Sequence, residues 1–230
     1  MANILCIETS TTVCSVAVFS DNDMLFERTE TKGQSHAALL GVFVEDAVEN
    51  LRKQGLKPDA IAVSCGPGSY TGLRIGVSEA KGLCYGLDIP LIAINTLLIM
   101  ASGLLDSHEL PANALLCPMI DARRMEVYSA IYNQDLTIVR DIQADIITEA
   151  SYNDLLDNHR IIFFGDGAEK CKETLTHPNA LFIDNFHPLA SYMKELANHA
   201  FNNKHFADVA YFEPFYLKEF VATTPKNKVI

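Results

Sequence analysis

Side chains suited to phosphate or metal chemistry follow the first apolar run of the chain. Residues 4–8 read ILCIE, so the run ends at an acidic residue, and a turn rich in hydroxyl groups follows at 9–12. An acidic group at a strand end can hold a metal ion, and hydroxyl and backbone N–H groups of the next turn can hold phosphate. A second apolar run, 161–164, ends in a Gly-Asp-Gly turn that could approach a nucleotide in the same way. The candidate nucleotide-facing residues are therefore Glu8, Thr9, Ser10 and Asp166.

The first of these turns also has a purely structural explanation. Its serine and threonine side chains can satisfy the backbone of a hairpin turn without any ligand. A lone Gly-Asp-Gly turn is likewise weakly specific for nucleotides. We favour the structural role for the present protein and interpret the four residues as the vestige of an ancestral nucleotide site.

The most distinctive run of the chain is GPGSYTGLRIG at residues 66–76. It is not a P-loop, because the Lys-Ser/Thr ending that contacts phosphate and Mg²⁺ is missing and because Pro67 removes a backbone donor. Gly72, Gly76 and Ala80 follow at four-residue spacing, so one face of a helix here would be almost bare of side chains. Such a face lets another backbone come close, either in a partner or within this chain.

No set of residues has the spacing of a catalytic or metal-binding site. The seven histidines include no i, i+4 pair, no serine lies in a G-x-S-x-G motif, and the six cysteines include no C-x-x-C pair. Cysteines spread among apolar neighbours are typical of free thiols in a reducing compartment. The sequence predicts no catalytic residue, no metal site and a cytoplasmic location.

Composition and charge narrow the range of partners. Of the 230 residues, 49% are hydrophobic and 20% are charged, which is typical of a globular protein. The formal net charge of -11 disfavours independent binding to nucleic acid, because neutralising phosphates requires clustered Lys and Arg. The longest uncharged stretch, 89–105, is shorter than the ~20 apolar residues of a membrane span. We therefore expect no membrane partner and no independent binding to nucleic acid.

Hydrophobic periodicity and turn residues predict the elements that position these groups. Three strands form an antiparallel meander, and alternating helices and strands follow. Ser35 is the expected N-cap of the first helix. The predicted order is strands at 4–8, 13–19 and 24–29, a helix at 35–53, a strand at 60–64, a helix at 70–86, a strand at 91–94 and a helix at 96–105.

A second copy of the meander begins near Leu115. At a constant offset of 113, Ile7-Glu8 falls on Ile120-Asp121 and residues 16–19 fall on 129–132. The second copy is abridged, with a strand at 161–164 and a helix at 191–202. Two duplicated β-β-β-α-β-α lobes predict an α/β protein of the actin/hexokinase-like (ASKHA) fold. We expect lobes at 1–105 and 106–205, with the tail, about 206–230, packing back on the first lobe.

The helix predicted at 35–53 has more apolar surface than one sheet can cover. Leu40, Val44, Ala47, Val48 and Leu51 form a core stripe, and Leu39, Val42 and Phe43 widen it. Beside a glycine-faced helix, this surface predicts a protein–protein contact, although the second lobe could also cover it. The candidate partner interface consists of His36, Leu39, Val42, Phe43, Tyr70, Gly72, Leu73, Gly76 and Ala80.

Several of these motifs together resemble the TsaB (YeaZ) family. The resemblance covers nearly the whole chain and is densest over residues 4–132. Its motifs are IETS at 7–10, Ser35-His36, the glycine-rich run at 66–76, AKGL at 80–83, PLIAINTL at 90–97 and DARRMEVY at 121–128.

The resemblance implies a non-catalytic subunit in the synthesis of threonylcarbamoyladenosine (t6A) at adenosine 37 of tRNA. The catalytic paralogue TsaD transfers the threonylcarbamoyl group, TsaE is the ATPase, and TsaC/Sua5 supplies threonylcarbamoyl-adenylate, so this subunit needs no cofactor itself. TsaD carries a metal-binding His-x-x-x-His, where this chain has Thr96 and Met100. Family members dimerise through first-domain helices, which correspond here to 35–53 and 70–86.

Two other functions stay open at this point. A small ATP-dependent phosphotransferase of the same fold would use Glu8, Thr9 and Asp166 towards its nucleotide. A metallopeptidase is suggested only by older names of the family. The sequence does not decide whether the chain alone is a homodimer or a monomer.

Overall fold

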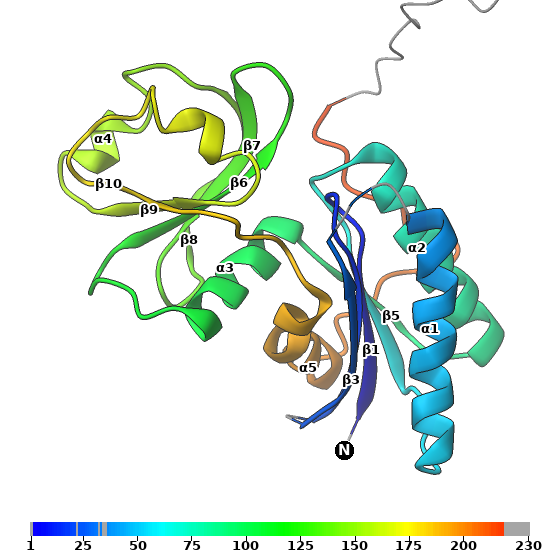
Figure 1. Ribbon diagram of the computed structural model, residues 1–230. Helices are drawn as coiled ribbons and strands as arrows, with labels where there is room; N and C mark the ends of the chain where they lie inside the picture. The colour runs from blue at the N-terminus through cyan, green and yellow to red at the C-terminus, as the bar shows by residue number, and fades with distance from the viewer. Residues whose placement is uncertain (1, 22, 32, 34–35, 219–230) are drawn as a thin grey trace, which may run out of the picture.

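The computed structural model describes residues 2–21, 23–31, 33 and 36–218. The predicted N-cap Ser35 and the end of the tail after residue 218 lie outside these ranges. In the described part, two five-stranded sheets lie side by side, each with its own helices (Figure 1).

The first sheet combines a meander with two parallel strands. Its order is β3-β2-β1-β4-β5, in which β1, β2 and β3 are antiparallel and β4 and β5 run parallel to β1. The central strands β1 and β4 are buried on both faces, which explains why they read as continuous apolar runs. The bounds are β1 Asn3–Glu8, β2 Cys14–Ser20, β3 Asp23–Glu30, β4 Ala60–Ser64 and β5 Leu91–Ile94.

Two long helices cover one face of this sheet. They are α1, His36–Lys53, and α2, Tyr70–Leu87, and their buried side chains form one core with β1, β2 and β4. Helix α2 begins where predicted because the Ser69 side chain accepts a hydrogen bond from the backbone N–H of Gly72.

The second sheet repeats this topology with shorter helices. Its order, β10-β9-β6-β7-β8, corresponds strand for strand to the first sheet. Single short turns, α4 and the 3₁₀ turn η1, stand where the first lobe has its long helices. This confirms the predicted duplicated actin/hexokinase-like fold with an abridged second lobe. The bounds are β6 Leu115–Asp121, β7 Glu126–Tyr132, β8 Ile138–Ile146, α4 Asn153–Leu156, β9 Ile161–Phe164, η1 Glu169–Cys171 and β10 Ala180–Ile183.

The predicted lobe boundaries need correction, because the lobes exchange helices. Helix α3, Thr96–Ser107, comes from the first half but packs against β6 and β7 of the second sheet. The 3₁₀ turn η2, Ala190–Met193, and helix α5, Lys194–Asn202, come from the second half but cover the free face of the first sheet. Figure 1 shows α5 against this sheet, opposite α1 and α2. Dividing the chain at 105/106 therefore separates each sheet from one of its covering helices.

The chain after α5 returns along the first lobe. Ala207 bridges to Leu91 at the edge strand β5, and Val209 and Phe212 pack against the core under α2. The segment then passes between the lobes, where residues 215–218 lie beside residues of both. No helix in the described residues is both long enough and apolar enough to span a membrane.

Candidate functional site

The glycine face of α2 packs within this chain and is not available to a partner. A Cβ on Gly72 would lie 2.1 Å from the carbonyl oxygen of Thr9, and one on Gly76 would lie 2.2 Å from the Thr9 hydroxyl. That hydroxyl donates a 2.8 Å hydrogen bond to the Gly72 carbonyl. The bare face is required by the close approach of the β1–β2 turn.

Four of the predicted interface residues are therefore misplaced. Leu73 and Ala80 are fully buried, and Gly72 and Gly76 are buried beneath Thr9. The prediction that they face a partner is wrong, and the alternative of close packing within the chain is correct.

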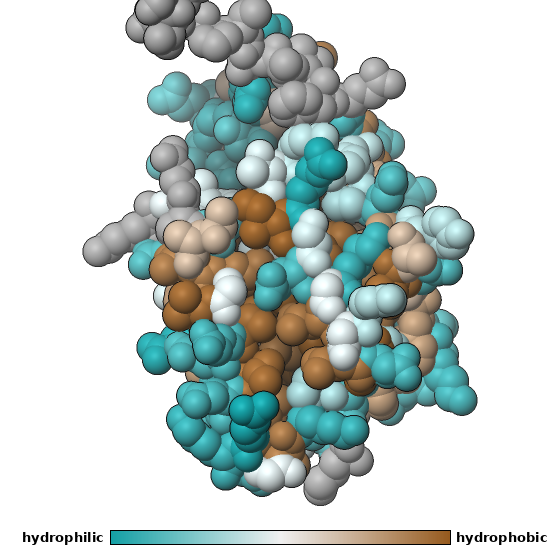
Figure 2. All heavy atoms as spheres, turned by 90° about the vertical axis from the view of Figure 1, so that its right-hand side faces the viewer, coloured by the Kyte–Doolittle hydropathy of each residue, from teal (hydrophilic) through white to brown (hydrophobic). Residues whose placement is uncertain are grey.

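The solvent-facing sides of α1 and α2 carry a different set of small and apolar residues, which we call the open helical face. Val42 is 50% exposed, and Leu39 and Phe43 are half-buried beside it. Figure 2 views this side of the molecule and shows apolar side chains gathered there. The open helical face comprises Leu39, Gly41, Val42, Phe43, Gly82 and Gly86.

Three helical glycines of the open helical face have no packing role in this chain. A Cβ on Gly41, Gly82 or Gly86 would meet nothing within 4 Å. Each glycine makes its helix less stable than alanine would, by up to about 1 kcal/mol. The sequence prediction missed them, although the i, i+4 spacing of Gly82 and Gly86 was a readable signal.

His36 and Tyr70 are the first residues of α1 and α2, and both have contacts within the chain. The His36 ring nitrogen Nε2 is 2.8 Å from the Thr11 carbonyl oxygen, which fixes the start of α1 to the β1–β2 turn. The Tyr70 hydroxyl accepts a 2.7 Å hydrogen bond from Arg74, and its ring lies 5.0 Å from that of Tyr216. Tyr70 therefore belongs to the mouth of the cleft between the lobes.

This interlobe cleft has a volume of about 570 Å³. Both lobes and the tail line it, and its walls combine hydroxyl groups, three tyrosine rings and charged side chains of both signs. The lining comes from residues 10–12 and 68–71 of the first lobe, residues 120–123, 128 and 166 of the second lobe, and residues 215–218 of the tail.

Of the four predicted nucleotide-facing residues, the structure places two at the cleft and two inside the fold. Asp166 lines the cleft and is exposed, and Ser10 lines it but is itself fully buried, whereas Thr9 is fully buried against α2. Glu8 is also fully buried, and its Oε1 accepts a 2.6 Å hydrogen bond from the backbone N–H of Ser10. The expectation that Glu8 and Thr9 face a nucleotide is wrong, because both are committed to the packing of the β1–β2 turn.

Desolvation raises the pKa values of the Glu8 and Asp166 carboxyl groups. Desolvation raises the pKa of Glu8 to about 7, and the Ser10 and Ser64 hydroxyls beside it only partly offset this effect. Desolvation at the cleft wall raises the pKa of Asp166, although this residue is still exposed to solvent. A hydrogen bond from the Asp121 backbone N–H opposes this rise, and the neighbouring charge of Asp121 adds to it. At neutral pH a substantial fraction of Glu8 is therefore an uncharged carboxylic acid.

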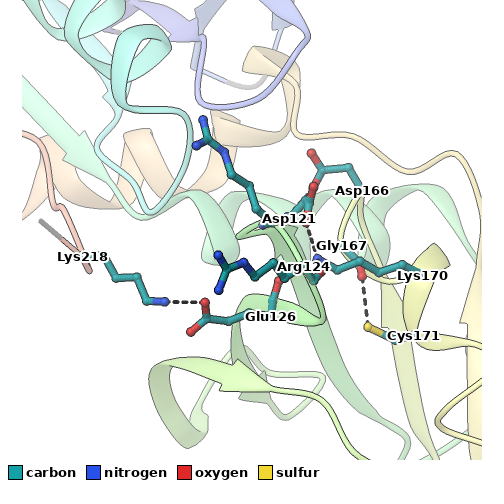
Figure 3. A network of polar contacts seen from close by, with 9 residues as sticks. Asp121, Arg124, Glu126, Asp166, Gly167, Lys170, Cys171 and Lys218 are labelled. Carbon is teal, nitrogen blue, oxygen red and sulfur yellow. Dashed lines mark hydrogen bonds and ion pairs between the residues drawn. The ribbon is translucent and has the colours of Figure 1, made fainter. Parts of the chain in front are cut away.

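The turn between β6 and β7 forms the second-lobe wall of the cleft. Arg123 and Arg124 both adopt left-handed backbone conformations, with φ of 69° and 50°. Lys170 holds this turn by contacting Asp121 Oδ1 and donating hydrogen bonds to the carbonyl oxygens of Arg124 and Glu126 at 2.6 and 2.7 Å (Figure 3). Lys170 could not be predicted from the sequence, because it is remote from the turn along the chain.

Across the described residues, no three His, Cys, Asp or Glu side chains converge as metal ligands would.

Comparisons with known proteins agree with the fold. The family model for TsaD, tRNA N6-adenosine threonylcarbamoyltransferase, matches residues 29–225. Two solved structures from Pseudomonas aeruginosa superpose with TM-scores of 0.82 and 0.80 at 24% identity. They cover 95% and 94% of this chain and 100% of each of those chains. One is described as YeaZ, the other as an uncharacterized protein with similarity to peptidase YEAZ.

Two curated relatives point to a more specific family. The tRNA threonylcarbamoyladenosine biosynthesis protein TsaB of Haemophilus influenzae is 30% identical over 94% of this chain and 93% of its own length. TsaB of Escherichia coli is 36% identical, over 57% of this chain and 55% of that protein.

The duplicated lobes and the family-model match define a two-lobed actin-like protein related in sequence to the TsaD family. Within that class, the chain belongs to the TsaB (YeaZ) family.

Proposed function

We propose that this chain is a non-catalytic subunit of the machinery that forms t6A in tRNA, and that it binds the catalytic paralogue TsaD through the open helical face. The names of its relatives support the pathway. The match to the TsaD model supports a partner of the same fold, since the two proteins would present equivalent helices to one another. The observation that carries the proposal is the set of three glycines that the chain's own packing does not require.

The chemistry of this face suits another helix pair. Glycines without neighbouring atoms let a second backbone approach closely, and Val42, Leu39 and Phe43 provide apolar area on α1. Because the net charge of this chain is -11, the partners would supply most of the tRNA-binding surface. In this scheme TsaE consumes ATP, TsaC/Sua5 supplies the activated threonylcarbamoyl group, and the complex is cytoplasmic.

A matched pair of valine substitutions tests the interface. Val42→Asp places a charge on the open helical face, and Val139→Asp places the same charge on β8 of the second lobe, where valine is 40% exposed. An unpaired charge in an interface costs about 2 kcal/mol or more, so Val42→Asp should weaken binding to TsaD by at least about 30-fold. Val139→Asp should bind like the wild type.

The measurement is isothermal titration calorimetry with TsaD from the same organism, followed by t6A formation in the reconstituted system. Circular dichroism should show both variants folded, because both positions are exposed. Equal binding by Val42→Asp and the wild type would refute the assigned interface. Transfer activity in the isolated chain would refute the non-catalytic role.

A further inference from the structure

The tail crosses from one lobe to the other at the mouth of the cleft. Residues 211–218, which we call the strap, pass the N-terminal end of α2 and line the cleft from Phe215 to Lys218. At the opposite side the lobes are already joined, because α3 and η2 pack together and a Cβ on Gly103 would meet the Tyr192 ring. The strap thus connects the lobes where they would otherwise separate.

The strap makes several contacts with the first lobe. Lys81 Nζ donates a 2.9 Å hydrogen bond to the carbonyl oxygen of Phe212, and a 3.2 Å hydrogen bond to that of Ala210 just before the strap. The backbone N–H of Phe215 donates a 2.7 Å hydrogen bond to the Cys65 carbonyl. Several backbone bonds and apolar contacts hold this end, so the strap should stay with the first lobe when the cleft opens.

Gly66 provides a specific reason for this close fit. A Cβ at Gly66 would lie 2.5 Å from the Phe215 carbonyl oxygen, and its φ of 109° also favours glycine. The turn after β4 is therefore shaped to receive the strap backbone. Tyr216 completes the contact through its ring against Tyr70.

In the described residues, one ion pair links the strap to the second lobe. Lys218 Nζ pairs with Glu126 Oε2, whose side chain is 18% exposed, whereas the Lys218 side chain is 46% exposed (Figure 3). Glu126 is well positioned because Lys170 holds its carbonyl oxygen. A partly exposed ion pair is weak and is screened by salt, so this contact can release while the first-lobe contacts persist.

We propose that the strap holds the interlobe cleft at its present opening, with the Lys218–Glu126 ion pair as its releasable fastening. This device is independent of the proposed function, because it concerns the isolated chain. When the Lys218–Glu126 ion pair breaks, the second-lobe wall at 120–128 can move away from the turn at 66–72.

Charge reversal and charge exchange test the strap. Lys218→Glu and Glu126→Lys each place like charges together, and the double variant restores an opposite pair. Hydrogen–deuterium exchange of the peptides covering 66–72 and 120–128 should increase about two- to fivefold in each single variant, the range expected for an ion pair of this kind. The double variant should return to the wild-type rate.

Lys172→Glu is the matched control, because Lys172 pairs with Asp184 on the second lobe away from the cleft. It should leave exchange in both cleft segments unchanged. In the wild type, raising the salt from about 20 mM to about 500 mM should reproduce the effect of the single variants, because screening shortens the range of the attraction. Unchanged exchange in both single variants, or a double variant that stays as fast as the singles, would overturn the proposal.

Discussion

The role of Glu8 in the structure differs from the role that the sequence suggests. By residue type and position, an acidic group at the end of a strand could hold a metal ion. In the fold Glu8 is fully buried, its Oε1 accepts from the Ser10 backbone, and its pKa is raised to about 7 by desolvation. Its carboxyl group therefore contributes to the pH dependence of stability and does not reach the cleft.

The sign of that dependence follows from the direction of the pKa shift. Between pH 4.5, the ordinary value, and about pH 7, the unfolded chain releases a proton that folded Glu8 retains. The free energy of unfolding should therefore fall as the pH rises through this window, by about 3 kcal/mol in total at about 1.4 kcal/mol per pKa unit.

Glu8→Gln should remove this slope, because the amide is neutral at every pH and can still accept from the Ser10 N–H. Urea unfolding at a series of pH values measures the effect. Glu27→Gln, on the exposed part of β3, is the control and should keep the wild-type slope. A wild-type slope in Glu8→Gln would contradict the assignment of the pH dependence to this residue.

At the scale of elements, two glycines of α2 have opposite surroundings, so the same substitution should have opposite effects on stability. Gly72 is in contact with the Thr9 backbone, whereas Gly82 faces open space. Gly72→Ala should destabilise the isolated chain by about 1–3 kcal/mol, because the β1–β2 turn must move. Gly82→Ala should stabilise it by up to about 1 kcal/mol, because alanine is the better helix former.

Thermal unfolding of the two single variants measures this contrast. The same helix and the same substitution are compared, so differences in propensity cancel. Equal effects at the two positions would show that Thr9 does not constrain α2.

Most of the helices and strands were predictable from the sequence, but the elements against which they pack were not. Periodicity located α1 and α2, and the constant offset from Ile7 to Ile120 revealed the duplication. Helix α4 was not predicted because its four residues are too few to show helical periodicity. Strand β10 was also missed, although the equally short strands β5 and β9 were predicted.

The candidate site was predicted only in part for a related reason. Glycine spacing identified a bare helix face but could not tell which chain covers it. Gly72 and Gly76 proved to be internal, while the open glycines were overlooked. Contacts between residues far apart in sequence, such as Lys170 with the 121–126 turn, leave no local pattern.

At the scale of the whole molecule, the exchange of α3 and α5 makes the two lobes interdependent. A fragment of residues 1–105 lacks α5 and η2, so Ile4, Phe19 and Ile92 lose the cover of one sheet face. A fragment of residues 106–230 lacks α3, which covers the other sheet. Neither fragment should fold alone.

Fragment complementation tests this interdependence. Each fragment alone should give poorly dispersed amide resonances, and mixing them should restore the dispersion of the intact chain, because each supplies the helix that the other lacks. A well-dispersed spectrum from residues 1–105 alone would contradict the expectation.

The same exchange has a consequence for synthesis on the ribosome. All five strands of the first sheet have been made once residue 94 emerges, but the residues that cover its second face, 190–202, come roughly a hundred residues later. At about 5–20 residues per second, the nascent chain carries an uncovered apolar sheet for about 5–20 seconds. During that interval the growing polypeptide presents a binding surface for chaperones that the finished protein no longer has.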